Sequence, residues 1–214
     1  GYADYVVAMT SSHFASAEKQ FRFPLEYANQ RPMSATWTVT GSGAYVLGKR
    51  KSNACITGIT TGKIIDYGIK DSMNMGAAMA PAAADTICQN LKDFGRRPED
   101  YDHIITGDLG SVGREILIDL LKKEGYDISE MHLDCGMLIY ESKAQGTGAG
   151  GSGCGCSAVT LAGHFLKQVE QGKLQRILFV PTGALLSTVS FNEGKTVPGI
   201  APVSYTHLTL PTKA

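Results

Sequence analysis

The stretch Gly146–Leu161, GTGAGGSGCGCSAVTL, decides how the rest of the sequence is interpreted. Glycine tolerates positive φ and close backbone approach, so this run predicts a tight passage that leads into a helix. Cys154 and Cys156 stand where the passage turns helical, and the free N–H groups of a helix start favour negative charge. The pattern predicts either close packing of a helix on a sheet or contact with an anionic ligand.

The composition is that of an ordinary globular protein, with 43% hydrophobic and 19% charged residues in a chain of 214. Lys plus Arg and Asp plus Glu number 20 each, so no overall field favours nucleic acid or an anionic membrane surface. Five cysteines without a signal-peptide pattern favour free thiols in a reducing compartment. No apolar run approaches the roughly 20 residues of a membrane span.

Both ends of the sequence lead us to expect a piece of a longer chain. The sequence starts at Gly1 without methionine, and Tyr5–Thr10 (YVVAMT) reads as a buried strand with no preceding partner. Near the other end, Val203–Leu208 (VSYTHL) is what one frame of a common sequencing-library transposon end would encode. We therefore expect a missing upstream part and a non-native tail over residues 202–214.

Short apolar segments alternate with helical ones along the chain, which predicts an α/β layered fold with a largely central sheet. The patterns predict strands within 35–51 (two strands or one with a bulge), 55–67, 103–106, 137–140 and 176–180. They predict a helical stretch over 75–94 whose firmest part is 82–91, and helices over 113–123 and 157–171. Gly95, Gly125 and Gly172 stand at the ends of these three. Residues 11–32 mix polar and aromatic residues with prolines and predict a loop with one helical turn.

Seven strings in fixed order carry a resemblance to one family within the thiolase superfamily. They are TSSHFASAEKQFRFPLEY, TVTGSGA, MGAAMAPAAADTI, YDHIITGDL, DCGMLIY, GGSGCGCSAV and PTGALLS. Together they span most of residues 8–201 and resemble the stage V sporulation protein AD family of endospore-forming bacteria. The resemblance implies a thiolase-like α-β-α-β-α layered fold. Residues 1–52 would end its first half, and residues 53–201 would supply most of its second half.

The resemblance also implies a function. Members of this family bind dipicolinic acid and take part in moving calcium dipicolinate into the developing spore. We therefore expect dipicolinic acid, free or as its calcium chelate, as the ligand, and other sporulation transport proteins at a membrane as partners. The implied location is the cytoplasm or the periphery of the spore inner membrane. The sequence does not decide the oligomeric state, but a homodimer is one alternative, because thiolase-like proteins often pair through their central sheets.

Departures from condensing enzymes of this fold argue against catalysis. Where such an enzyme has a pocket histidine at the end of a strand, HIITGDL has Gly107 and Asp108. Where its loop carries asparagine or histidine, GGSGCGCS offers Ser152, Cys154 and Cys156, and the nucleophilic cysteine would belong to the missing upstream half. We expect no catalytic residues, no cofactor and no metal site, since a C-x-C without a close histidine or carboxylate lacks zinc spacing.

Two other functions stay open. The first is a thiolase-like acyltransferase or condensing enzyme acting on thioesters of coenzyme A or a carrier protein. The second is a scaffold subunit of a membrane-associated complex with a vestigial pocket.

The candidate ligand-binding residues follow from what a dianionic pyridine requires, namely cations or donated N–H groups. They are His13, Arg22, Asp108, Leu109, Ser152, Cys154 and Cys156. Arg31 is a further candidate cation near Arg22. Asp108 lies at the carboxyl end of a predicted strand, where α/β sheets place ligands, but aspartate there also commonly caps the next helix. Of the two thiols we expect one to be structural and one to line the pocket.

Overall fold

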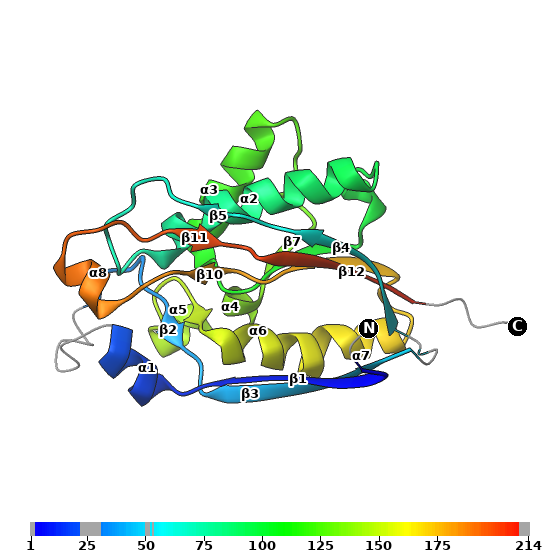
Figure 1. Ribbon diagram of the computed structural model, residues 1–214, viewed down its shortest axis with the longest axis horizontal. Coiled ribbons are helices and arrows are strands. Elements are labelled where there is room, and N and C mark those ends of the chain that lie inside the picture. Colours follow the sequence, from blue (N-terminus) through cyan, green and yellow to red (C-terminus); the bar gives the residue numbers. More distant parts are fainter. Residues whose placement is uncertain (1–2, 22–30, 50–51, 53, 210–214) are drawn as a thin grey trace, which may run out of the picture.

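The computed structural model describes residues 3–21, 31–49, 52 and 54–209, which form stacked layers of helix and sheet (Figure 1). From top to bottom in Figure 1 these layers are the helices α2 and α3, a five-stranded sheet, a helical layer that contains α6 and α7, and a two-stranded ribbon of β1 and β3. The layering confirms the predicted α/β class.

The five-stranded sheet is mixed, and its parallel part positions the candidate site. In spatial order it contains β4 (Ala54–Thr61), β12 (Val203–Thr209), β9 (Arg176–Val180), β6 (His103–Thr106) and β7 (His132–Asp134). Strand β6 is parallel to both β7 and β9, whereas β12 is antiparallel to both β9 and β4. The carboxyl ends of β6, β7 and β9 therefore meet at one edge of the sheet.

Helices α2 (Met75–Asp93) and α3 (Gly110–Lys123) cover the outer face of this sheet. The Asn74 side chain accepts a hydrogen bond from Ala77 N at the start of α2, and Gly95 at φ 57° follows its end, as predicted. Glycines let the two helices approach closely, because a Cβ on Gly76 would lie 2.9 Å from the backbone nitrogen of Gly113. Strand β6 shows the alternation of a buried strand, with Ile104 in this outer core.

The inner face of the sheet packs on a helical segment that runs through α6 (Cys154–Thr160), the π-turn η3 (Leu161–Phe165) and α7 (Leu166–Glu170). Ile105 of β6 belongs to this second core together with the fully buried Phe165 and Val169. The segment agrees with the helix predicted after the glycine passage. Gly172 at φ 70° follows its end, as expected of a helix-terminating glycine.

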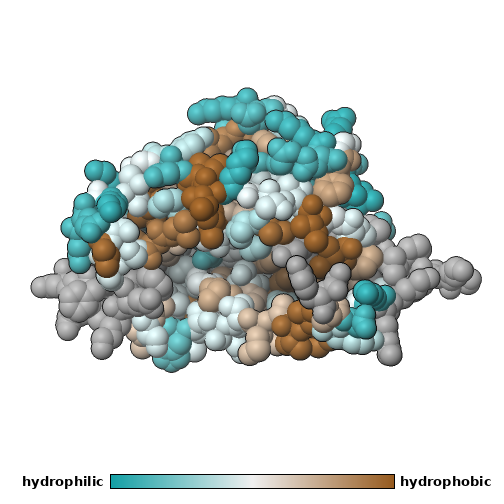
Figure 2. All heavy atoms as spheres, in the orientation of Figure 1, coloured by the Kyte–Doolittle hydropathy of each residue, from teal (hydrophilic) through white to brown (hydrophobic). Residues whose placement is uncertain are grey.

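The ribbon of β1 (Tyr5–Ser12) and β3 (Gly41–Gly48) covers the other side of α6. Its glycines allow the close approach, since a Cβ on Gly43 would lie 2.7 Å from the Cβ of Ala158. The prediction that β1 is buried was wrong: Val7 is 60% and Met9 78% exposed. Figure 2 shows this hydrophobic surface at the lower edge of the molecule. The apolar run YVVAMT thus pairs as a strand while its outer face remains uncovered by any described residue.

The remaining elements are short and lie between the layers or at the ends of the sheet. They are α1 (Phe14–Phe21), β2 (Trp37–Thr38), β5 (Ile64–Ile65), η2 (Pro98–Asp100), α4 (Cys135–Leu138), α5 (Ser142–Gln145), β8 (Gly151–Ser152), β10 (Gly183–Ala184), α8 (Thr188–Asn192) and β11 (Gly199–Ile200). Strands β10, β11 and β5 form a small antiparallel sheet, and β2 pairs in parallel with β8.

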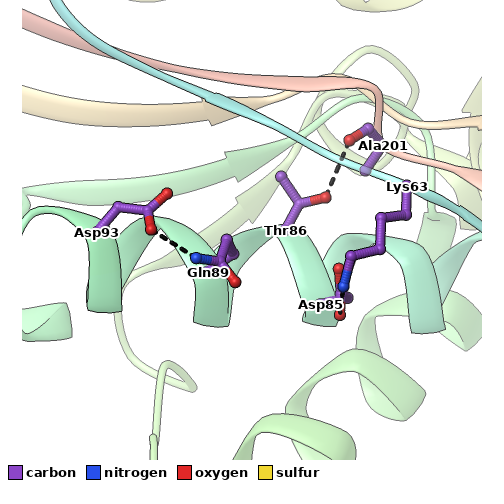
Figure 3. A network of polar contacts seen from close by, with 6 residues as sticks. All are labelled: Lys63, Asp85, Thr86, Gln89, Asp93 and Ala201. Carbon is purple, nitrogen blue, oxygen red and sulfur yellow. Dashed lines mark hydrogen bonds and ion pairs between the residues drawn. The ribbon is translucent and has the colours of Figure 1, made fainter.

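Polar contacts fasten α2 to Lys63 and Ala201, which lie above the helix in Figure 3 and between strands in the chain. The Thr86 hydroxyl donates to the carbonyl oxygen of Ala201 over 2.9 Å, and Lys63 Nζ lies 3.5 Å from Asp85. The Lys63 pair is exposed and contributes little to stability, whereas the Thr86 bond is fully buried. This network therefore belongs to the framework rather than to a ligand site.

Several expected boundaries differ from the structure. The predicted strand 137–140 is wrong, because Asp134 Oδ1 accepts from Met137 N and starts the helical turn α4. Helix α3 begins at Gly110, earlier than the predicted 113. Helix α2 begins at Met75, as the helical composition of 75–94 predicts, and Pro81 lies inside it before the firmest predicted part at 82–91. The loop predicted over 11–32 contains the helix α1.

The expected non-native tail enters the five-stranded sheet as β12, between β4 and β9. A strand at this place joins β4 to the rest of the sheet, so the position belongs to the architecture. The origin of the residues that occupy it stays a prediction, as do the domain limits 1–52, 53–201 and 202–214.

Among the described residues, no helix combines the length and the apolar composition that crossing a membrane requires.

Candidate ligand site

The candidate site lies at the edge of the sheet where β6, β7 and β9 end. Three chain segments leave those strands there: Gly107–Asp108 after β6, Cys135 onward after β7, and Pro181–Thr182 after β9. The glycine passage runs up to this edge through β8, because Gly153 N donates to Asp108 Oδ2 over 2.9 Å.

Asp134, at the end of β7, organises the buried side of this edge and was not among the predicted site residues. It is 1% exposed and accepts four hydrogen bonds. The donors are Thr106 Oγ1 at 2.7 Å, Leu109 N at 2.9 Å, Gly110 N at 3.1 Å and Met137 N at 3.1 Å. One carboxylate thus fixes the starts of both α3 and α4 against β6. Burial raises the pKa of Asp134, and the four hydrogen bonds oppose that rise.

His132 extends this buried network. Its Nε2 lies 3.0 Å from Thr106 Oγ1, and the same hydroxyl donates to Asp134. The hydroxyl hydrogen is therefore used, so Nε2 of the neutral imidazole must be the donor and Nδ1 is unprotonated. Burial, with a smaller contribution from the charge of Arg114, lowers the pKa of His132 from 6.5 to about 3. The imidazole is neutral at physiological pH.

Asp108 joins three segments at the rim of the site. Its Oδ2 accepts from Gly153 N at 2.9 Å, and its Oδ1 accepts from Thr182 Oγ1 at 2.8 Å. Its own backbone N–H donates back to Thr182 Oγ1 over 2.9 Å. The helix-capping role considered for Asp108 belongs instead to Asp134, and Asp108 fastens the glycine passage to the loop after β9.

Gly107 packs directly against the loop after β9. A Cβ on Gly107 would lie 2.9 Å from both the backbone nitrogen and Oγ1 of Thr182, closer than real Cβ contacts come. A side chain at this position would therefore require Thr182 to move.

The glycine passage pairs with residues 37–39 as a tight backbone ladder. Trp37 N donates to Gly150 O over 2.8 Å, and Val39 N donates to Ser152 O over 2.9 Å. Gly150 and Gly153 have φ of 128° and 95°, values that other residues rarely adopt. The passage is thus both a packing device and a wall of the site, so the two alternatives drawn from its sequence are compatible.

The two thiols of the passage have different surroundings. Cys154 is exposed, and its Sγ lies 3.2 Å from the carbonyl oxygen of Ser11. Cys156 is fully buried, and burial together with the charges of Asp108 and Asp134 raises its pKa. The structure therefore makes Cys156 the structural thiol and leaves Cys154 accessible at the rim.

Ser12 connects β1 to this rim and was missed by the sequence analysis. Its hydroxyl donates to Val39 O over 2.6 Å and accepts from Gly155 N over 3.0 Å. The hydroxyl fixes the first turn of α6. His13, the next residue in the chain, is exposed. The signal was present in TSSH, which ends a predicted strand.

Of the two candidate cations, the structure describes Arg31 alone. Arg22 lies outside the described residues. The guanidinium of Arg31 lies 4.3 Å from the ring centroid of Trp37 and donates to Thr36 O over 3.2 Å. Trp37 in turn stacks on Phe14, with ring centroids 5.2 Å apart. Arg31 therefore joins β2 to α1.

Asp108, Ser152, Cys154 and Cys156 are brought together at one edge, whereas the fully buried Leu109 side chain belongs to the outer core. Ser152 is 1% exposed, so its side chain also faces the interior. Within the described part of the chain, no cluster of three or more His, Cys, Asp and Glu side chains is arranged to hold a metal ion. An apolar hollow of about 260 Å³ lies elsewhere, on the flank of α6 and η3 beside Leu138 and His164.

The layering and this edge define a thiolase-like fold. 3-Oxoacyl-(acyl carrier protein) synthase III, FabH, from Pseudomonas aeruginosa PAO1 has a TM-score of 0.56 and 14% identity over 100% of this chain and 60% of its own. The tetronic acid condensing enzyme AbyA1 has a TM-score of 0.53 and 14% identity over 97% of this chain and 58% of its own. At such identities these likenesses show the fold alone.

The family follows from the sequence comparisons. The family model of Stage V sporulation protein AD (SpoVAD) matches residues 1–205. Stage V sporulation protein AD of Bacillus subtilis (strain 168) is 52% identical over 201 residues, which cover 94% of this chain and 59% of that protein. The chain belongs to the stage V sporulation protein AD family and spans about 59% of the length of this relative.

Proposed function

We propose that this chain is part of a sporulation protein that binds dipicolinic acid, free or as its calcium chelate, without catalysing a reaction. In this proposal it takes part in the uptake of the ligand into the developing spore, beside other sporulation transport proteins at a membrane. Family membership supports the sporulation role. The non-catalytic part is supported by the residues at the end of HIITGDL: Gly107 has no side chain to transfer a proton, and both oxygens of Asp108 accept hydrogen bonds from the protein.

The groups that remain near this place are poorly suited to acid–base or nucleophilic chemistry. Both oxygens of Asp108 already accept hydrogen bonds from the protein. Burial raises the pKa of the Cys156 thiol, so this sulfur stays protonated and unreactive. A general base or nucleophile needs a group that is both accessible and close to its reacting pKa.

The arrangement is better suited to holding an anion in place. Asp108 and Asp134 turn their oxygens toward N–H and O–H groups of the protein, which reduces their repulsion of a negative ligand at the rim. Cys154 is exposed beside Gly153, and His13 is exposed next to Ser12, whose hydroxyl accepts from Gly155 N. A calcium ion bound to dipicolinate would neutralise the carboxylates of the ligand, since calcium prefers oxygen ligands.

Calorimetric titration of the protein, expressed at the full length that its gene encodes, tests the proposal. Dipicolinic acid should bind saturably with and without calcium, and isophthalic acid, which lacks the ring nitrogen, should bind more weakly. His13→Ala should weaken binding, whereas the matched control His164→Ala, beside the remote apolar hollow, should leave it unchanged. An absence of saturable heat at millimolar dipicolinic acid would refute the proposal.

Two outcomes would replace this function with the alternatives. Turnover of coenzyme A or carrier-protein thioesters that disappears on replacement of an upstream cysteine would identify an acyltransferase or condensing enzyme. Co-purification with membrane partners in the absence of ligand binding would identify a scaffold subunit.

A further inference from the structure

The segment between β10 and β11 carries exposed apolar side chains that no described residue covers. Leu185 is 43%, Val189 64% and Phe191 51% exposed, and α8 itself contributes no buried residue. In Figure 1, α8 lies with α1 at the left end of the molecule, toward which β9 runs into β10. Since β6 is parallel to β9, this is also the end where the candidate site is located.

The base of this segment is firmly anchored. Leu185 N donates to Pro198 O over 2.8 Å, and Val197 N donates to Ile69 O over 2.7 Å. Val197 is 3% exposed, and Gly199 packs so tightly on α2 that a Cβ there would lie 2.9 Å from the Cα of Met79. Among the described residues, hydrogen bonds to the rest of the molecule hold this segment at its two ends, at Leu185 and at Thr196, whose hydroxyl donates to Asp66.

The tip of the segment has its own local structure. Ser187 Oγ accepts from Ser190 N over 3.0 Å and caps α8, and Gly194 at φ 66° follows the helix. A Cβ added to Gly194 would meet nothing within 4 Å, so this side of the turn is open. Lid hinges are a few loop or helix-end residues, which is the kind of residue that joins this tip to its base.

The base begins in the candidate site. Thr182, whose hydroxyl donates to Asp108, immediately precedes β10, and Leu185 immediately follows it. A ligand that contacts this rim therefore lies close in the chain to the start of the segment.

We propose that residues 186–195 form a lid that closes over a ligand bound at the rim of Asp108 and Thr182. In this proposal Val189 and Phe191 cover the face of a planar aromatic dicarboxylate and exclude water from it. The lid rests on the proposed ligand-binding function, because its occupant is that ligand. Closure would bury the apolar side chains that the open structure exposes, which favours the closed state only when a ring is present to cover.

Hydrogen exchange and stopped-flow binding with dipicolinic acid, on the protein at its full encoded length, test the lid. The ligand should slow exchange of amides 188–194. Phe191→Ala should speed ligand dissociation by about tenfold with little change in the association rate, since losses in related complexes appear mainly in dissociation. Ile59→Ala, an exposed apolar residue on β4 at the far edge of the sheet, is the control and should change neither rate.

The possible failures are distinguishable. Dipicolinic acid that binds equally well to wild type and Phe191→Ala, with unchanged exchange over 188–194, would overturn the lid and leave the proposed function standing. Wild-type protein that does not bind the ligand would overturn both. Protection of 188–194 that needs no ligand and grows with protein concentration would assign α8 to a contact between copies and overturn the lid.

Discussion

Asp134 and Asp108 lie at the ends of neighbouring parallel strands, at the same edge of the sheet, yet they have different structural roles. Asp134 ends β7 inside the molecule, where it accepts four hydrogen bonds and fixes the starts of two helices. Asp108 follows β6 at the rim, where it joins the glycine passage to the loop after β9. A carboxylate at the end of a parallel strand is therefore placed at this edge of the sheet. The hydrogen-bond donors around it then decide whether it holds the framework together or lines the candidate site.

Removing the Asp134 side chain should have the largest effect. Asp134→Ala leaves two buried and one partly buried backbone N–H groups and the Thr106 hydroxyl without their acceptor, which should lower the free energy of unfolding by about 3–5 kcal/mol. Urea denaturation measures this change. Asp134→Asn, which keeps one acceptor oxygen, should lose less. A loss below about 1 kcal/mol for Asp134→Ala would mean that the framework role is misassigned.

His132 should make stability depend on pH through the same network. Its folded pKa of about 3 lies below 6.5, so the unfolded chain takes up the proton first as pH falls. The contribution of His132 to stability is therefore complete above pH 6.5 and decreases below it, by up to about 1.4 kcal/mol per pH unit. Asp134, whose pKa is raised, acts in the opposite sense, and Arg114 adds positive charge nearby.

Comparing wild type with His132→Gln isolates this effect, since glutamine keeps a donor for Thr106 but does not titrate. Unfolding free energies between pH 7 and 4.5 should fall more steeply for wild type than for the variant. Parallel curves for the two proteins would show that His132 does not titrate differently on folding.

Breaking the rim should cost less and act locally. Thr182→Val removes both hydrogen bonds that Thr182 Oγ1 makes with Asp108, and should lower the free energy of unfolding by about 1 kcal/mol. Hydrogen exchange should speed up in residues 146–153, while the amides of Leu109 and Gly110, held by Asp134, keep their protection. Equal acceleration at both places would remove the distinction between the two carboxylates.

The thiols should show the same division between rim and interior without any change in stability. A thiol reagent should label Cys154 in the native protein, because this thiol is exposed. Cys156 is buried and its pKa is raised, so it should react at least about a hundredfold more slowly. Mass spectrometry of labelled peptides measures both, with Cys154→Ser as the control. Fast native labelling of Cys156 would show that the interior beneath Asp108 opens readily.

The strands, helices and helix ends that depend on residues close together in the chain could be predicted from the sequence. The alternation of strands and helices, the buried strands at 103–106 and 176–180, and the helix ends before Gly95, Gly125 and Gly172 were all predicted correctly. Local steric preferences and helix capping act over a few residues, so a linear pattern is enough to reveal them. The ordered strings also predicted the family, and the family model confirms it.

The roles of individual side chains and the burial of individual segments depend on the tertiary structure. The sequence analysis missed Asp134 because the N–H of Leu109, from which it accepts a hydrogen bond, lies 25 residues away in the chain. The N–H of the glycine passage that donates to Asp108 likewise lies 45 residues from it. The exposure of β1 and the helical turn in MLIY likewise depend on what packs beside each segment rather than on its own apolar pattern. The order of strands in the sheet sets these distant partners, and hydrogen-bond satisfaction of buried groups then fixes each role.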